Sequence, residues 1–410
     1  MEITIRPKAT VGGVITVPGD KSISHRAVIL GAIAQGITQI HGFLRGHDNL
    51  ATISCLRQLG VNFEENVEDN VLQVEGVGLH GLKPPKDILF CGNSGTTMRL
   101  LCGLLAGQNF DSVLNGDNSL RNRPMERVAI PLRLMGAEIE TAGGKAPIKI
   151  GGRPLTGVNY QMPIYSAQVK SAILLAGLYA KGKTIVTEPT PGLTRNHTEI
   201  MLENWQHLGG NIHICGDFSS AAFFIVLGLL LADNGITIQN VGLNPTRTGL
   251  LSVLQNMGGN IRASITKIEG GEAVGDIFVK KSKLHSINLS GNQIPLMIDE
   301  IPIFAVATLF AEGTTIISDA EELAVKESNR LKTITEELTK MGAEITAHNQ
   351  GMVIRGGQKI RGATLNSHGD HRIAMSLAIA ATVAQGPSII QDAHCADISF
   401  PHFYKTLYQF

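Results

Sequence analysis

The sequence predicts an α/β protein of at least two domains, assembled from six related repeats of which one is truncated. The chain has 410 residues, which is more than one ordinary domain holds. Hydrophobic residues make up 43% of the chain, enough to fill more than one core. A pattern of an apolar helix, a glycine and a β-branched strand recurs six times, and this recurrence sets the number of repeats.

A glycine marks the junction between helix and strand in each copy. The six glycines are Gly36, Gly107, Gly182, Gly235, Gly313 and Gly386. Four of the five intervals between them are 71 to 78 residues, longer than common solenoid repeats, so compact domains are expected. Chance recurrence of small residues is the competing interpretation, and the nearly even spacing argues against it.

A second pattern lies between these copies: an amphipathic helix that ends in glycine before a strand. It reads LRQLGVNF, LRLMGAEI, WQHLGGNI, LQNMGGNI and LTKMGAEI. Each repeat is therefore expected to hold two helices and several strands. After LTKMGAEI, 23 residues lead to the next Gly-Asp pair, but after WQHLGGNI only three do. The third repeat is thus expected to be shortened near 210–216, by about 20 residues.

Charge and cysteine content argue against several classes of protein. Lys and Arg together number 35, as do Asp and Glu, so a nucleic-acid-binding or polybasic membrane protein is not expected. The longest apolar run, 220–232, is too short to span a membrane, and the N-terminus has no apolar signal core. The cysteines form no CxxC pair, which argues for a reducing, cytoplasmic compartment: Cys55, Cys91, Cys102, Cys215 and Cys395.

Motifs at the starts of the repeat helices carry candidate anion ligands. Gly-Asp precedes three of these helices, at 19–20, 216–217 and 369–370. The N-terminus of a helix binds anions through its backbone N–H groups, although simple capping also explains such residues. KSISHR adds Lys21, Ser22 and Arg26 to the first start, a set that fits phosphate binding or a solvated basic turn.

Other motifs add glycine and arginine. GNSGTTMRLL provides Gly95, whose missing side chain leaves room for a ligand, and LRNRPM provides Arg121 and Arg123. A plain turn and a surface loop are the alternatives. AVKESNRL holds three charged residues, either ligands or an ordinary ion-paired helix face: Lys326, Glu327 and Arg330.

Acidic and histidine residues gather in two further motifs. Asp299 and Glu300 precede an apolar helix, where an acid is either a cap or a base. SHGDHR holds His368, His371 and Arg372 without the spacing of zinc ligands, so no metal is expected.

Together these motifs resemble the EPSP synthase family, the 3-phosphoshikimate 1-carboxyvinyltransferases. The resemblance covers essentially the whole chain and follows the family's order: GDKSISHRA, GNSGTTMRLL, NSLRNRPM, YSAQVKSAILLAGL, LTRNHTEIML, GDFSSAAFF, IDEIPIFAVATLFAEGTT, AVKESNRL and GDHRIAM. It implies a two-domain inside-out α/β barrel with three βαβαββ repeats in each domain, whose helix N-termini face a shared cleft. One domain is expected to be discontinuous, residues 1–18 with 218–410, and the other to be the insert 19–217.

The resemblance implies an enzyme that transfers the enolpyruvyl group of phosphoenolpyruvate to the 5-hydroxyl of shikimate 3-phosphate, releasing phosphate. This reaction belongs to the shikimate pathway to chorismate and aromatic amino acids. Each substrate carries roughly three negative charges. Six cations are expected to compensate them: Lys21, Arg26, Arg123, Lys326, Arg330 and Arg372.

Matching positions also imply which residues bind each substrate. Shikimate 3-phosphate would be held by Lys21, Ser22, Arg26, Ser166, Gln168, Thr194, Asp299 and Lys326. Phosphoenolpyruvate would be held by Lys21, Gly95, Arg123, Gln168, Arg330 and Arg372. In the implied addition–elimination, Asp299 takes the hydroxyl proton, Glu327 shuttles the C3 proton and Lys21 assists. No metal or organic cofactor is expected; glyphosate is expected to compete with phosphoenolpyruvate, and the protein to be monomeric.

The chain departs from the family pattern at four places. Asn329 replaces an acid, so a supporting interaction is expected to be lost, and Ile398 stands where one branch has a lysine that contacts phosphoenolpyruvate. Thr194 keeps the hydroxyl of the usual serine. The shortened stretch near residue 215 lies at an inter-domain crossing, which is either rebuilt or impairs closure and activity.

Two other functions remain open. The sister transferase that acts on UDP-N-acetylglucosamine opens with Lys-Asn and has a reactive cysteine near position 115. Here Lys21 is followed by Ser22, and that region reads LNGDNSLRNRP. A catalytically impaired, ligand-binding member of the family would fit the truncation, but the intact Asp299, Glu327 and Arg372 argue against it.

Overall fold

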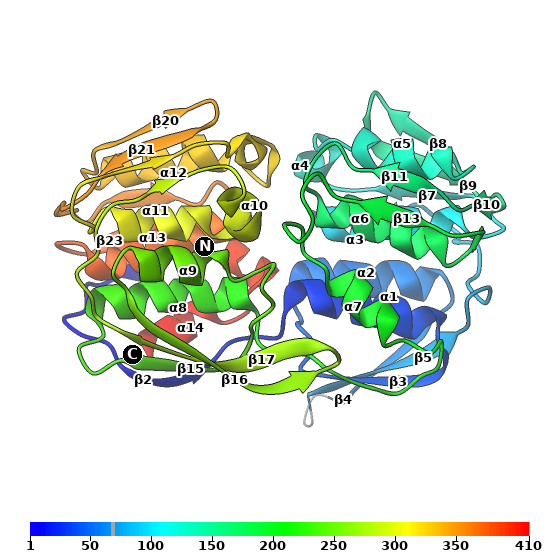
Figure 1. Cartoon of the computed structure of the whole chain (residues 1–410), viewed down its shortest axis with the longest axis horizontal. Helices are drawn as coiled ribbons and strands as arrows, with labels where there is room; N and C mark the ends of the chain where they lie inside the picture. Colours follow the sequence, from blue (N-terminus) through cyan, green and yellow to red (C-terminus); the bar gives the residue numbers. More distant parts are fainter. Residues whose placement is uncertain (67–69, 410) are drawn as a thin grey trace. The chain divides into compact units, whose positions relative to one another are not determined.

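The computed structural model describes residues 1–66 and 70–409, which divide into two compact units (Figure 1). The first unit comprises Met1–Pro18, Cys215–Ile268 and Ala273–Phe410, and the second comprises Gly19–Ile214 and Glu269–Glu272. The second boundary thus falls three residues before the position expected from the sequence. The assignment of 269–272 to the second unit is unexpected, and it follows from the packing of these four residues on a helix of that unit.

The first unit holds twelve-odd short strands and several helices in the order of the repeats, with bounds as follows. Its strands are β1 (Ile3–Ile5), β2 (Gly13–Thr16), β15 (Ile236–Gly242), β16 (Asn260–Glu269), β17 (Glu272–Lys280), β18 (Asn288–Leu289), β19 (Thr314–Ile317), β20 (Ile345–His348), β21 (Gly351–Arg355), β22 (Thr364–Asn366) and β23 (Ser388–Gln391). Its helices are α8 (Phe218–Leu231), α9 (Gly249–Asn256), α10 (Gln293–Met297), α11 (Ile301–Thr308), α12 (Arg330–Lys340), α13 (His371–Val383) and α14 (Phe403–Tyr408), with 3₁₀ turns η1 (Ile298–Glu300), η2 (Glu321–Val325) and η3 (Ala393–Ile398).

The second unit is built from the same kinds of element. Its strands are β3 (Gln35–His41), β4 (Asn62–Asn66), β5 (Val71–Val77), β6 (Leu89–Phe90), β7 (Ser112–Asn115), β8 (Glu138–Ala142), β9 (Lys145–Gly151), β10 (Leu155–Thr156), β11 (Asn159–Gln161), β12 (Ala180–Lys181), β13 (Ile185–Thr187) and β14 (Asn211–His213). Its helices are α1 (Lys21–Ile33), α2 (His47–Gln58), α3 (Gly95–Ala106), α4 (Asn118–Arg121), α5 (Glu126–Leu134), α6 (Ala167–Gly177) and α7 (His197–Glu203).

Four sheets share one topology, which is the structural form of the repeat. Their strand orders are β18-β19-β21-β20, β6-β7-β9-β8, β2-β15-β17-β16 and β14-β3-β5-β4. In each, two strands pair in parallel around a helix, and the second of them also pairs antiparallel with a hairpin. The β1-β23-β22 sheet is completed by the N-terminal strand of the chain.

The shortened repeat is the exception to this topology. Strands β11 and β13 form a two-stranded parallel sheet, and among the described residues no hairpin follows α7. Residues 204–210 lead directly to β14, which pairs in parallel with β3 through Ile212 and Ile40. An isolated bridge between Leu208 and Gln35 precedes that pairing. Within the second unit, the missing stretch is therefore replaced by a direct run into the neighbouring sheet.

Apolar helices form the interior of each unit. In the first unit, α8, α11 and α13 pack against one another, and every residue of α11 is buried. In the second unit, α3 packs closely on α6. A helix that is apolar on all sides is stable only when other elements surround it, and the sheets lie outside these helices in each unit (Figure 1). In the part of the chain that is described, no helix is both long and apolar enough to cross a membrane.

Candidate active site

The residues expected to bind substrate fall into two clusters, one within each unit. The second-unit cluster comprises Lys21, Ser22, Arg26, Gly95, Arg123, Ser166, Gln168 and Thr194. The first-unit cluster comprises Asp299, Lys326, Glu327, Arg330 and Arg372. Hydrogen bonds and ion pairs connect members of each cluster to one another or to intermediate side chains. Among the described residues, no group of three or more His, Cys, Asp or Glu is arranged to hold a metal ion.

The aspartates of the three Gly-Asp pairs are helix caps. Asp20 accepts a hydrogen bond from the Ile23 N–H at 2.8 Å, Asp217 from Ser219 at 2.6 Å and Asp370 from Arg372 at 3.0 Å. A side-chain oxygen at this position satisfies one of the backbone donors that the first helical turn leaves without a partner. For these side chains, therefore, the capping interpretation is correct.

Arg26 is the most deeply buried cation of the second-unit cluster, at 4% exposure. Its Nε donates to Thr198 Oγ1 at 2.5 Å, one Nη donates to Ser171 Oγ at 2.6 Å, and the other donates to the Ser22 carbonyl at 2.8 Å. Burial lowers the pKa of Arg26 to about 10, while the carboxylates of Glu199 and Asp20 act in the opposite direction. The guanidinium is therefore still charged at neutral pH, and hydroxyl groups hold it in a fixed orientation.

Lys21 stands at the start of α1 and forms an ion pair that the sequence did not reveal. Its Nζ lies 2.5 Å from Asp48 Oδ2, and the two side chains are 15% and 7% exposed. Asp48 belongs to the first turn of α2, whose N-terminus favours a negative charge. The ammonium group is thus oriented by a carboxylate from the neighbouring helix.

Gly95 lies against two guanidinium groups at the start of α3. A Cβ atom at this position would stand 2.9 Å from an Arg99 Nη and 3.3 Å from an Arg123 Nη. Arg123 is 7% exposed and donates to Asn93 Oδ1 and, at 3.4 Å, to Ser119 Oγ. The glycine is therefore required sterically, because any side chain would displace one of the arginines.

Gln168 joins α6 to this arginine pair. Its Oε1 accepts from Arg99 at 2.5 Å, and its Nε2 donates to Thr96 Oγ1 at 2.9 Å. Arg99 also donates to the Pro124 carbonyl at 3.2 Å. Our sequence analysis omitted Arg99, although it lies within the quoted GNSGTTMRLL motif, where a second arginine near Gly95 is the signal that could have found it.

Two hydroxyl residues of the second-unit cluster differ in their environment. Ser166 caps α6 and accepts from the Val169 N–H at 3.4 Å. Thr194 is 4% exposed, yet its Oγ1 has no hydrogen-bond partner among the described residues. Its N–H donates to Glu188 at 3.1 Å, so the backbone is fixed while the hydroxyl remains available to a ligand. A buried hydroxyl without a partner is costly in a folded protein, and such groups often serve a ligand.

Arg330 is the centre of the first-unit cluster and is 1% exposed. Its guanidinium lies 2.8 Å from Asp370, 2.6 Å from Glu327 and 3.2 Å from Asp299. Burial alone lowers the pKa of Arg330, but the carboxylates of Asp370, Glu327 and Asp299 outweigh it and raise the pKa above its ordinary value. Arg330 thus joins the first residue of α12 to the cap of α13 and to the turn before α11.

Arg372 completes this cluster from the first turn of α13. It donates to the Asp299 carbonyl at 3.2 Å and to Glu300 Oε1 at 3.4 Å. Glu300, which is 1% exposed, also accepts a hydrogen bond from Ser219 Oγ. Asp299 is thus a ligand of two arginines, and Glu300 is neither the cap nor an exposed acid.

Lys326 and Asn329 flank this ion-pair network. Burial lowers the pKa of Lys326, while Asp299 and Glu322 act in the opposite direction. Asn329 caps α12 by accepting from the Lys332 N–H at 3.2 Å. An amide oxygen fills this role as well as a carboxylate does, so the expected loss of a supporting interaction is not seen at this cap.

The expected charge balance is wrong for the first-unit cluster. Its three cations are accompanied by four carboxylates, those of Asp299, Glu300, Glu327 and Asp370. The count of six compensating cations omitted these acids, which are distant in sequence. The second-unit cluster gains Arg99, and it is there that cations cluster around Gly95.

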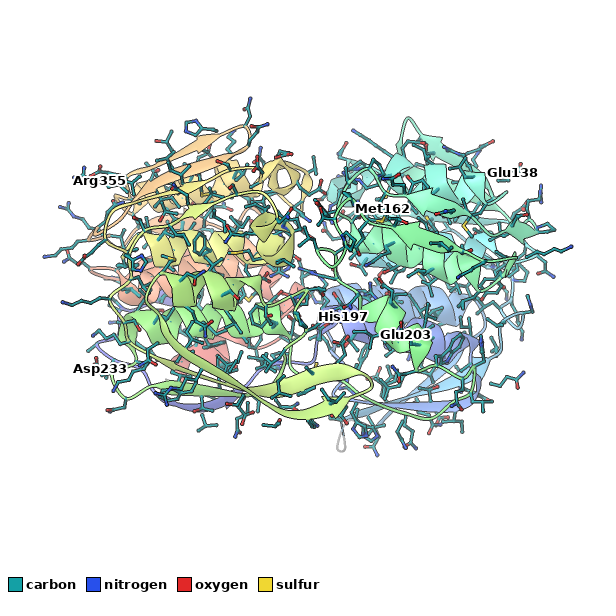
Figure 2. All side chains as sticks on the ribbon, viewed as in Figure 1. Glu138, Met162, His197, Glu203, Asp233 and Arg355 are labelled. Carbon is teal, nitrogen blue, oxygen red and sulfur yellow. The ribbon has the colours of Figure 1, made fainter. Side chains whose placement is uncertain are left out.

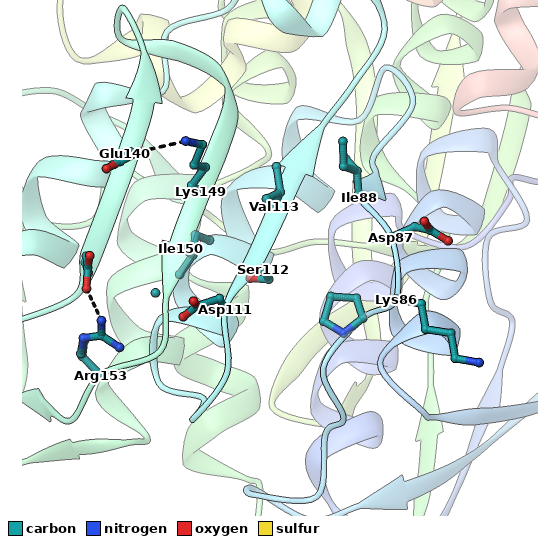
Figure 3. Close-up of a pocket in the computed structure, with 13 residues that line it drawn as sticks. Lys86, Asp87, Ile88, Asp111, Ser112, Val113, Glu140, Lys149, Ile150 and Arg153 are labelled. Atoms are coloured by element: carbon teal, nitrogen blue, oxygen red, sulfur yellow. Dashed lines mark hydrogen bonds and ion pairs between the residues drawn. The ribbon is translucent and has the colours of Figure 1, made fainter.

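The remaining sequence candidates lie in other surroundings. His368 binds Glu337 through Nε2 at 2.8 Å, Arg121 donates to Asn115 Oδ1 at 3.1 Å, and Ile398 ends η3. A hollow of about 670 Å³ lies on the outer face of the β6-β7-β9-β8 sheet (Figure 3). Exposed ion pairs border it, such as that of Lys149 with Glu140, and none of the expected substrate ligands lines it.

Comparison with solved structures places this fold among the enolpyruvyl transferases. The enolpyruvyl transferase NikO from Streptomyces tendae superposes with a TM-score of 0.78 at 16% identity, over 99% of this chain and 96% of that one. An EPSP synthase from Acinetobacter baumannii superposes with a TM-score of 0.86 at 43% identity, over 100% of this chain and 98% of that one.

Sequence comparison gives the family. The EPSP synthase (3-phosphoshikimate 1-carboxyvinyltransferase) family model matches residues 5–207 and 203–407. A 3-phosphoshikimate 1-carboxyvinyltransferase of Thermoanaerobacter sp. (strain X514) is 49% identical over 99% of both chains, and one of Geotalea daltonii is 48% identical over 98% of both. The chain therefore belongs to the EPSP synthase family. The alignment with the Thermoanaerobacter relative spans 424 positions, more than the 410 residues of this chain, so the relative has residues that this chain lacks.

Proposed function

We propose that this protein transfers the enolpyruvyl group of phosphoenolpyruvate to the 5-hydroxyl of shikimate 3-phosphate and releases phosphate. The arrangement around Gly95 carries the proposal. Two arginines flank a residue without a side chain at a helix start, and Gln168 lies within hydrogen-bonding distance of one of them. Such a group suits a small ligand with both a carboxylate and a phosphate, because guanidinium groups bind each of these in a forked geometry. Membership of the EPSP synthase family supports the same reaction.

Substrate ligands are proposed within both clusters. Shikimate 3-phosphate is held by Lys21, Ser22, Arg26, Ser166, Gln168, Thr194, Asp299 and Lys326, and phosphoenolpyruvate by Lys21, Gly95, Arg123, Gln168, Arg330 and Arg372. The hydroxyl of Thr194 and the oriented guanidinium of Arg26 support the first set. The two compact units support two domains, proposed at 1–18 with 218–410 and at 19–217.

The proposed chemistry is addition followed by elimination. The 5-hydroxyl attacks C2 of phosphoenolpyruvate as C3 gains a proton, and the tetrahedral intermediate then loses phosphate as C3 gives a proton up. Asp299 accepts the hydroxyl proton, Glu327 carries the C3 proton, and Lys21 supports the charge that develops. Arg330 contacts both acids, at 3.2 Å and 2.6 Å, which keeps them together. We further propose a cytoplasmic monomer in which glyphosate competes with phosphoenolpyruvate.

Phosphate release from purified protein tests this function. With shikimate 3-phosphate and phosphoenolpyruvate both present, we expect continuous release of phosphate and none when either substrate is omitted. Release with UDP-N-acetylglucosamine in place of shikimate 3-phosphate would assign the protein to the sister reaction instead.

A binding protein without catalysis is the second candidate, and the shortened repeat favours it. Calorimetry with shikimate 3-phosphate distinguishes it from the enzyme. Binding without any release of phosphate would support the second candidate, whereas turnover would reject it.

A further inference from the structure

The hairpin of β16 and β17 ends in a tip that belongs to the second unit, although its strands lie in a sheet of the first. Gly270 and Gly271 form the turn, and both have positive φ, 56° and 84°. Two such residues in succession make the tight hairpin turn whose twist matches that of the strands. The residue after this turn is Glu272, which has no part in the roles described above.

The tip is packed tightly on α7. A Cβ atom on Gly271 would stand 2.7 Å from Ile200 Cγ2 and 2.8 Å from Asn204 Nδ2. The backbone of the tip therefore approaches the helix as closely as only glycine allows. Figure 2 labels His197 and Glu203, which mark the two ends of α7.

Glu272 reaches the first residue of the same helix. Its Oε1 lies 2.6 Å from His197 Nδ1, and the two side chains are 7% and 2% exposed. A carboxylate buried to this extent needs a hydrogen-bond partner, and the imidazole supplies one. The pair therefore fixes the start of α7 to the hairpin tip.

The next residue of α7 is a ligand of Arg26. Thr198 Oγ1 accepts from Arg26 Nε at 2.5 Å and lies 2.7 Å from Ser171 Oγ. A shift of the start of α7 would therefore displace the hydroxyl that orients this guanidinium. The Glu272 carboxylate also acts on Arg26 electrostatically and, with Glu199 and Asp20, counters the effect of burial on its pKa.

We propose that Glu272 and His197 are positioning residues for shikimate 3-phosphate. They hold α7 so that Thr198 keeps Arg26 in its binding orientation, and the hairpin tip is thereby part of the substrate site. This inference rests on the proposed function, since it takes Arg26 as a ligand of that substrate. By linkage, substrate bound at Arg26 must also stabilise the docked hairpin tip.

Variants of Glu272 test the proposal through the kinetics of the two substrates. We expect Glu272→Ala to raise KM for shikimate 3-phosphate at least tenfold and to change kcat less than threefold. Glu272→Gln keeps an oxygen that accepts from the imidazole, so it should restore most of this loss. Equal increases for both substrates, or a fall in kcat with KM unchanged, would overturn the proposal.

A matched pair of glycines separates the contact from general strain. Gly144 is the second glycine of the β8–β9 turn and has φ of 82°, close to the 84° of Gly271, but the nearest atom to its Cβ would be Glu126 Cγ at 3.2 Å. Gly271→Ala should raise KM for shikimate 3-phosphate severalfold, and Gly144→Ala should leave it unchanged. Identical effects of the two variants would refute a role for the tip.

Hydrogen exchange of the ligand-free protein gives a readout that does not depend on the reaction. We expect Glu272→Ala to increase exchange of the α7 amides, 197–203, while those of α5 keep their wild-type rates. Unchanged exchange of α7 would contradict the proposal even in an active enzyme. If the wild type shows no turnover, the proposed function fails, and the exchange result still decides whether Glu272 holds α7.

Discussion

Asp370 binds Arg330 through both of its carboxylate oxygens, at 2.8 Å and 3.2 Å, and the two side chains are 0% and 1% exposed. Asp370 caps α13, and Arg330 is the first residue of α12. One buried pair thus joins the starts of two helices, and Arg330 extends the connection to the two proposed catalytic acids, Asp299 and Glu327. Because both charges are buried, the loss of either leaves the other without full compensation.

Removing this carboxylate should destabilise the first unit strongly. We expect Asp370→Ala to reduce the free energy of unfolding by about 3–5 kcal/mol, because it breaks a buried ion pair and removes a helix cap. Urea denaturation measures the effect. Asp233→Ala is the control, since its ion pair with Lys281 is 57% exposed on the aspartate side and should contribute less than about 1 kcal/mol. Similar losses in the two variants would show that burial of the pair is unimportant.

The hydroxyl of Thr194 should matter to the ligand and little to the fold. Thr194→Val keeps the shape of the side chain and removes a hydroxyl that has no partner among the described residues. We expect the affinity for shikimate 3-phosphate to fall about 10- to 100-fold in calorimetry, with an unchanged free energy of unfolding. Thr97→Val is the matched control: Thr97 Oγ1 bonds to Ser94, Thr52 and Asp48, so its loss should reduce stability. Loss of stability without loss of affinity at Thr194 would count against its role as a ligand.

Arg123 should contribute mainly to phosphoenolpyruvate. We expect Arg123→Ala to raise KM for phosphoenolpyruvate about 10- to 100-fold and KM for shikimate 3-phosphate much less, because a charge-assisted contact contributes roughly 1.5–3 kcal/mol. Arg121→Ala provides the comparison, since Arg121 lies in the same loop but bonds to Asn115. Equal losses for both substrates would disprove the proposed division of ligands.

Gly95 should not tolerate even one methyl group. In Gly95→Ala the new Cβ meets guanidinium nitrogens of Arg99 and Arg123 at 2.9 Å and 3.3 Å, so both arginines must move. We expect a higher KM for phosphoenolpyruvate and little change in the melting temperature. Gly210→Ala is the control, because no atom lies within 4 Å of its Cβ and its φ is not positive. A Gly95→Ala enzyme with unchanged KM would contradict the proposed position of the ligand.

Stability should fall in acid partly through Glu337. Burial raises its pKa, but hydrogen bonds from Lys340, His368 and the Asn366 N–H outweigh it, so the pKa is lower than in the unfolded chain. Its stabilisation is therefore full above the unfolded pKa of about 4.3 and is lost as the pH falls through the folded value. Glu337→Gln should be less stable than wild type at neutral pH, with a difference that shrinks on acidification. Urea denaturation across this range, with the exposed Glu344→Gln as control, would show parallel profiles if the idea is wrong.

Local sequence patterns were sufficient to find the helix starts and the motifs, but not the partners of the side chains. Capping by Asp20, Ser94 and Asp370 depends on residues two or three positions away, so a short window contains the whole interaction. Arg26, by contrast, is oriented by residues 145 and 172 positions further along the chain. No spacing rule connects such residues, because only the packing of α1 against α7 and α6 brings them together.

The sequence by itself determined the repeated α/β organisation, the anomaly of the third repeat and the family, since periodicity and motif order are properties of the chain. The tertiary structure alone decided which charges compensate one another: Asp48 beside Lys21, Arg99 beside Gln168, and four carboxylates around the arginines of the first unit. It alone also placed a hairpin tip against α7. The physical reason is that electrostatic attraction and packing depend on distance in space, which a folded chain sets independently of distance along the sequence.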